Sequence, residues 1–181
     1  MKIRSIILPA AIIAMLFAGC GQQPTTPTET TKAPDVVTSA SIVDNAAAFE
    51  KAIAKDGTWI IATTKDLSTD NKLVLEGEFK NGKKDDKGND VIQRKIGLYT
   101  QDENRNITAR FTLTAPELTV KSPNASIQHG TFKGDLIVDV KDFQLVDATV
   151  DGNVYFTSEE NQSTFKMDDK SKITGKQELK K

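Results

Sequence analysis

The chain of 181 residues carries 24 lysine and arginine against 25 aspartate and glutamate side chains, and its net charge of −1 gives no electrostatic basis for binding nucleic acid. A single cysteine and a single histidine exclude an internal disulfide and a cysteine–histidine zinc cluster. The length suits one folded domain with a tether.

The first residues have the parts of a secretory signal peptide. A basic start (MKIR) precedes an apolar run over residues 6–17, and two small residues stand before Cys20. The run is shorter than the roughly 20 residues of a membrane-spanning helix. The segment resembles the lipobox of bacterial lipoproteins, although Phe17 stands where that family favours leucine. The resemblance implies that residues 1–19 are a signal peptide and that Cys20 carries a diacylglycerol thioether. The alternative is a plain secretory signal with an incidental cysteine.

Residues 20–41 are expected to form a disordered tether. The stretch after Cys20 is dominated by proline, threonine and glutamine and offers almost nothing to bury (GQQPTTPTETTKAPDVVTSAS). About 20 such residues span roughly 25 Å. Gly21, in place of aspartate, resembles the outer-membrane sorting pattern of lipoproteins. We therefore expect a lipid-anchored, extracytoplasmic location at the cell membrane or the outer membrane.

A capping helix is expected within residues 42–57. Asp44 is a suitable N-cap, the helical period continues to Lys55, and Gly57 ends it. One face of this helix is apolar, formed by Ala46, Phe49, Ala52 and Ile53.

The rest of the chain, residues 58–181, reads as a β domain. Short strand-like runs separated by turn formers lie at Trp59–Ala62, Leu73–Leu75, Ile96–Tyr99 and Ile107–Leu113. Residues 80–90 (KNGKKDDKGND) are charged and contain glycine, so we expect an exposed loop there. The sequence shows no helix after this loop.

A repeat with an offset of 18 residues appears in the second half. Residues 118–135 align with residues 136–153, and a third copy begins at Val154 and then drifts. The aligned pairs include Leu118 with Leu136, Val120 with Val138, Ile127 with Leu145 and Phe132 with Val150. An apolar–any–glycine tripeptide recurs at residues 132–134, 150–152 and 173–175, and an earlier instance is proposed at residues 75–77.

This offset favours a mainly β fold of the solenoid type, a short parallel β-helix with the N-terminal helix as its cap. A coil of about 18 residues holds two or three short strands, and stacking the next coil on it buries the apolar strip and pairs the strand edges in parallel. Leu118, Leu136 and Val154 would form one internal ladder, and Phe132, Val150 and Ile173 another. The alternative is a compact antiparallel β-sandwich, which explains the strand density but not the offset.

Two segments resemble known right-handed parallel β-helix proteins. The capping helix followed by residues 57–61 (GTWII) looks like the start of the pectate-lyase-like branch. The segments GTFKGDL (130–136) and ATVDGNV (148–154) are similar to the bactofilins, which are polymer-forming bacterial scaffold proteins. The resemblance implies a fold and gives little information about activity.

No catalytic, metal-binding or cofactor-binding residue is assigned from the sequence. His129 is the only histidine and aligns with Asp147, which predicts a surface pair. Carboxylates suited to acid–base chemistry are numerous and none can be selected: Asp85, Asp86, Asp135, Asp139, Asp142, Asp147, Asp151, Asp168 and Asp169. Asn124, Asp142 and Glu160 share the 18-residue offset and would either stack as a calcium-binding oxygen ladder or be neutralised by solvent and nearby lysines, and we favour neutralisation.

The sequence therefore favours a membrane-anchored cell-envelope lipoprotein with a non-catalytic binding or structural role. Candidate partners are the membrane itself through the lipid, a cell-wall polysaccharide and another envelope protein. Two alternatives stay open, a carbohydrate-active β-helix enzyme and a bactofilin-like polymer-forming scaffold. We expect a monomer or small oligomer, because the helix covers one end of the coils and charged residues crowd the other.

Overall fold

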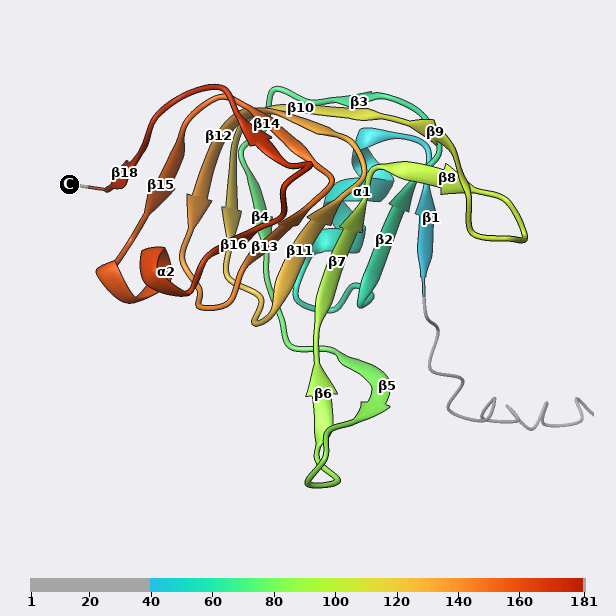
Figure 1. Cartoon of the computed structure of the whole chain (residues 1–181). Coiled ribbons are helices and arrows are strands. Elements are labelled where there is room, and N and C mark those ends of the chain that lie inside the picture. Colours follow the sequence, from blue (N-terminus) through green and yellow to red (C-terminus); the bar gives the residue numbers. More distant parts are fainter. Residues whose placement is uncertain (1–39, 181) are drawn as a thin grey trace, which may run out of the picture. The chain divides into compact units, whose positions relative to one another are not determined.

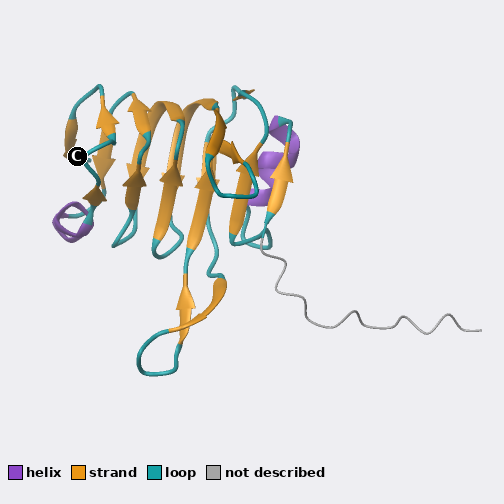
Figure 2. Cartoon of the chain, turned by 45° about the vertical axis from the view of Figure 1, so that its right-hand side comes forward, coloured by secondary structure: helices purple, strands orange, loops and turns teal. Residues whose placement is uncertain are grey.

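The computed structural model describes residues 40–180, and this part of the chain is mainly β (Figure 1). Two large sheets stack on one another with the hydrophobic core between them (Figure 2). The first, sheet A, has the strand order β1 (Ser41–Val43), β2 (Ile60–Thr63), β7 (Arg94–Gly97), β11 (Ala125–Gln128), β13 (Gln144–Val146) and β16 (Lys166–Met167).

Sheet B contains the longest strands. Its members are β3 (Leu67–Ser68), β4 (Leu73–Leu75), β10 (Thr112–Val120), β12 (Thr131–Val138), β14 (Thr149–Asp151), β15 (Val154–Phe156), β17 (Lys172–Ile173) and β18 (Gln177–Leu179). On one side, β10 pairs with the two short strands β3 and β4, and β12 pairs with β14 and β15. The pairing between β10 and β12 shifts register between Thr114 and Glu117 of β10.

The pairs within both large sheets are parallel, and this overturns the antiparallel sandwich alternative. Within residues 40–180, antiparallel pairing is confined to two hairpins, β5 (Lys80–Lys84) with β6 (Asp90–Ile92) and β8 (Tyr99–Gln101) with β9 (Ile107–Arg110). Parallel neighbours cannot be joined by a tight hairpin. The chain connects β1 to β2 through α1, and from β10 to β14 it passes alternately between sheet B and sheet A.

The 18-residue register is confirmed. Leu118 lies opposite Leu136, and Leu136 opposite Val154, in one fully buried ladder. Phe132 lies opposite Val150, which in turn faces Ile173 after a longer interval because a helix is inserted before it. The proposed early instance at residues 75–77 is wrong, since Leu75 pairs with Val120 and belongs to a different ladder.

The first helix, α1 (Ala46–Ile53), lies at the N-terminal end of the core. Its side chains Phe49, Ala52 and Ile53 are buried, and it packs against β1, β2 and β4 (Figure 1). The N-cap is Asn45, whose side-chain oxygen accepts a hydrogen bond of 2.9 Å from the Ala48 N–H, rather than the expected Asp44.

Three further expectations from the sequence differ from the structure. β1 begins at Ser41, inside the expected tether, because its three residues pair with β2. The expected loop at residues 80–90 forms the β5–β6 hairpin, in which Lys80 and Lys84 both bind the Asp90 carboxylate. A helix also follows it, α2 (Glu159–Thr164), capped by the Ser158 hydroxyl.

The predicted signal peptide, Cys20 and most of the predicted tether lie outside the described residues. Within residues 40–180, no helix is both long enough and apolar enough to cross a membrane.

Candidate functional site

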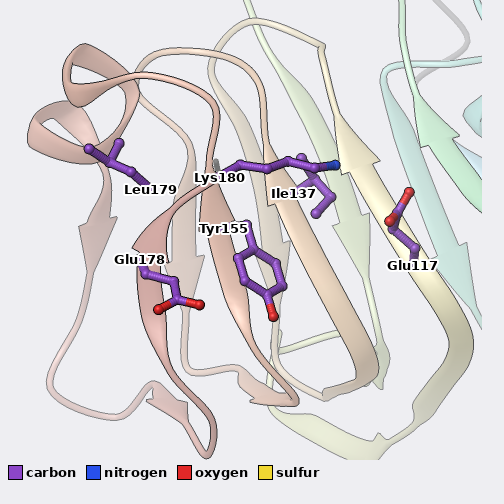
Figure 3. Close-up of a pocket in the computed structure, with 6 residues that line it drawn as sticks. All are labelled: Glu117, Ile137, Tyr155, Glu178, Leu179 and Lys180. Atoms are coloured by element: carbon purple, nitrogen blue, oxygen red, sulfur yellow. The ribbon is translucent and has the colours of Figure 1, made fainter.

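A groove of about 630 Å³ runs along the outer face of sheet B (Figure 3). Side chains alternate between the core and this face along each strand, so outward residues of successive strands align. One such row is Thr119, Ile137, Tyr155 and Glu178, taken from β10, β12, β15 and β18. The groove is lined by Glu117, Ile137, Tyr155, Glu178, Leu179 and Lys180.

Tyr155 occupies the middle of this groove. Figure 3 shows its ring between Glu178 and Ile137, while the Lys180 side chain extends toward Ile137 and Glu117 lies at the far end. The floor is apolar, because Ile137 is only 3% exposed although it lies on the outer face. Glu117 is held by an ion pair of 3.3 Å with Lys72.

This arrangement has the features of a ligand-binding surface. An aromatic ring with an apolar floor offers a flat surface for the apolar face of a ligand, and its hydroxyl provides a polar end. Carboxylates at the rim accept hydrogen bonds from hydroxyl groups. The site residues Glu117, Tyr155 and Glu178 were missed from the sequence, where the signal available was the pairing of outward positions 137 and 155 at the 18-residue offset.

The structure brings His129 and Asp147 together, as predicted. Both occupy left-handed turn conformations, with φ of 60° and 51°, at equivalent positions of successive turns. The His129 Nδ1 lies 3.0 Å from the Asp147 Oδ2, and Arg110 binds the same oxygen at 2.6 Å. The Tyr99 ring packs edge-on against the imidazole at 4.5 Å between centroids.

The Asp147 carboxylate is stabilised in its charged form. Hydrogen bonds from Arg110 and then from His129 hold the pKa of Asp147 below its usual range. Its backbone N–H donates to the Asp168 carboxylate, which also accepts from the Ser171 hydroxyl at 2.6 Å. This cluster links adjacent turns of the chain. The Asp147 carboxylate is already bound by Arg110 and His129, and the Asp168 carboxylate by Asp147 and Ser171.

The alternative oxygen ladder of Asn124, Asp142 and Glu160 does not form a shared site, and the carboxylates are paired with lysines, as favoured above. Asp142 pairs with Lys166 at 3.1 Å, and Glu160 pairs with Lys141 at 2.5 Å, so lysines neutralise both carboxylates. The Asn124 amide donates to a backbone carbonyl instead. Within residues 40–180, no three His, Cys, Asp or Glu side chains gather in a way that could hold a metal ion.

Several remaining carboxylates join one layer of strands to the next. The Asp135 carboxylate accepts hydrogen bonds from the backbone and side-chain N–H groups of Asn153, and Asp139 accepts from the Thr157 hydroxyl at 2.6 Å. Asp151 accepts from Thr174 in the same way. These side chains act as structural acceptors along the stack.

The chain matches no protein-family model, no curated protein and no solved structure among those with which it was compared. The role of the groove and of the cluster around Asp147 therefore follows from the residues that form them.

Proposed function

We propose that this chain is a lipid-anchored protein of the bacterial cell envelope with a non-catalytic binding role. The observation that carries the anchor is the order of basic start, short apolar run and small residues ending at Cys20. Two or three acyl chains on one cysteine hold a protein durably at a membrane, whereas a single chain binds marginally. Replacing Cys20 with serine should move the protein from the membrane fraction to the soluble fraction, and unchanged membrane retention would contradict the anchor.

The folded part, in this proposal, is a short parallel β-helix. Support comes from the path of the chain, which alternates from β10 in sheet B to β11 in sheet A, then β12, β13 and β14, with parallel partners one turn later. Buried ladders at a constant offset are what stacked coils produce. Helix α1 supplies the cap on the first coil, since three of its side chains enter the core.

The proposed binding surface is the groove on sheet B, and the proposed ligand is an envelope polysaccharide. Tyr155 on the apolar floor of Ile137 provides a stacking surface, and the rim carboxylates of Glu117 and Glu178 provide acceptors for sugar hydroxyls. A rigid parallel sheet holds these side chains at fixed spacing of about 4.8 Å from strand to strand, which suits an extended polymer.

A binding experiment tests the groove. Tyr155→Ala should weaken retention on isolated wall polysaccharide about tenfold, which corresponds to the loss of one aromatic contact of about 1.4 kcal/mol. Lys133→Ala is the matched control, because Lys133 is exposed on the same sheet outside the groove. Equal retention of both variants, with unchanged thermal unfolding, would contradict the assignment of the surface.

A carbohydrate-active enzyme is the second candidate, because Glu117 and Glu178 line one groove and glycoside hydrolysis uses two carboxylates flanking the bond. The same polysaccharide preparation separates the two functions. Soluble sugar released by the native chain and lost in Glu178→Gln would favour the enzyme, whereas retention without release supports binding.

A further inference from the structure

We propose that two copies of this chain join through their C-terminal layers, with β18 of one copy pairing antiparallel to β18 of the other. Two inward-facing residues of this layer are left exposed. Met167 is 44% exposed and Leu179 is 38% exposed, although their partners one layer earlier, Leu145 and Phe156, are buried at 1% and 0%. A second copy would cover these apolar side chains.

The outer edge of β18 also has free backbone groups. The Lys176 carbonyl accepts from Val154, and the Lys180 N–H donates to Phe156, so these residues use the side of β18 that faces β15. Backbone groups of alternate residues point to opposite edges of a strand, and the N–H and C=O of Leu179 therefore point away from β15. An unpaired edge of this kind is a template for another strand.

Charge favours a second copy as the occupant. Leu179 is flanked by Glu178 and Lys180, for which the described residues contain no ion-pair partner. Antiparallel pairing centred on Leu179 places each Glu178 opposite Lys180 of the second copy, and the two leucines face each other in a hydrogen-bonded pair. The segment is thus complementary to itself.

The other end of the stack explains why the contact should close at two copies. Helix α1 fills that end with Phe49, Ala52 and Ile53, so a C-terminal layer finds no matching open layer there. A contact made by the same surface on both subunits has two-fold symmetry and does not extend into a filament. The pairing does not require the polysaccharide proposal, but it shares Glu178, Leu179 and Lys180 with the groove. In the dimer the two grooves would be neighbours, and Glu178 would face Lys180 of the second copy.

Sedimentation velocity of the full chain in detergent, carrying Cys20→Ser, tests the pairing. The protein should sediment as a dimer, Glu178→Lys should raise the dimer dissociation constant about tenfold, and Glu178→Lys with Lys180→Glu should restore it because the opposite charges face each other again. A monomer at all concentrations, filaments, or a doubly exchanged variant as weak as Glu178→Lys would overturn the proposal.

A second measurement locates the contact. In the Cys20→Ser chain, Leu179→Cys provides the only thiol, and facing residues of a hydrogen-bonded pair lie about 5.5 Å apart, within disulfide range. Oxidation should give a covalent dimer. Val74→Cys is the matched control, because Val74 is similarly exposed, at 37%, on an edge strand at the other end of sheet B. Equal cross-linking of the two variants, or none with Leu179→Cys, would refute the assigned edge.

Discussion

Arg94 is the buried charge on which the attachment of the first helix depends. Its side chain is fully buried, and its guanidinium donates to the carbonyls of Ala52 at 2.7 Å, Ala54 at 3.0 Å and Glu76. The first two lie at the C-terminal end of α1, and each also accepts a backbone hydrogen bond, Ala52 from Thr58 at 3.4 Å and Ala54 from Gly57 at 3.0 Å. The Phe79 ring lies 4.0 Å from the guanidinium carbon. Burial lowers the pKa of Arg94 to about 10, so the group remains charged at neutral pH.

Removing this guanidinium should be costly. Arg94→Met removes three charge-assisted hydrogen bonds and takes from the Glu76 carbonyl the side-chain donor it has in the structure, and we expect the free energy of unfolding to fall by about 3 kcal/mol. Urea denaturation followed by circular dichroism measures the change. Lys133→Met, at an exposed position, is the control and should change stability by less than about 0.5 kcal/mol. Similar losses in the two variants would show that Arg94 does not anchor the helix.

Asp147 makes the free energy of unfolding depend on pH in the acid range. Its pKa is lowered in the folded chain by Arg110 and His129, so its contribution is complete above the unfolded value of about 3.9 and is lost as the pH falls through the lower folded value. Asp147→Asn should therefore lose less stability than the native chain between pH 5 and pH 3. Urea titrations at both pH values measure this difference. Lys133→Ala, at an exposed position, is the control for a surface substitution. An unchanged pH dependence in Asp147→Asn would contradict the role of the Asp147 cluster.

Among the elements, β12 gives the most direct test of the internal register. Phe132 is fully buried opposite Val150, and its neighbour Lys133 points outward. Phe132→Ala should lower the free energy of unfolding by about 3–5 kcal/mol, and Lys133→Ala by less than about 0.5 kcal/mol. Thermal or urea unfolding measures both. Equal sensitivity at the two positions would mean that the inward and outward faces are wrongly assigned.

The elements predicted well from the sequence are those set by a constant spacing. The 18-residue offset gave the partners of Leu118, Phe132 and Ile127 because parallel stacking repeats the same inward positions. Helix α2 was missed because its residues, EENQST, carry no apolar period, and its position depends on the Ser158 cap. Its insertion lengthens the interval between Tyr155 and its partner Glu178, and the groove between them could not be predicted for that reason.

Some contacts leave no pattern in the sequence at all. The partners of Arg94 are backbone carbonyls of residues 52, 54 and 76, and a backbone carbonyl is present at every residue. The sequence of the β5–β6 hairpin predicts a loop, because its lysines give no strand alternation. Their shared ion pair with Asp90 forms only when the two segments lie side by side.

At the scale of the whole molecule, the two ends of the sheet stack differ in kind. The N-terminal end is closed by α1, next to β1, where the described part of the chain begins. Edge strands occur at both ends, but at the C-terminal end the inward-facing Met167 and Leu179 are exposed. The groove and the open edge share β18 at the C-terminal end of sheet B.

The most direct test of the central proposal is the intact mass of the protein extracted with detergent from bacterial membranes. The proposal predicts a chain that starts at Cys20 and carries the added mass of a diacylglyceryl group, with or without a further amide-linked acyl chain. A chain that retains residues 1–19, or one cut without any acyl mass, would contradict the lipid anchor.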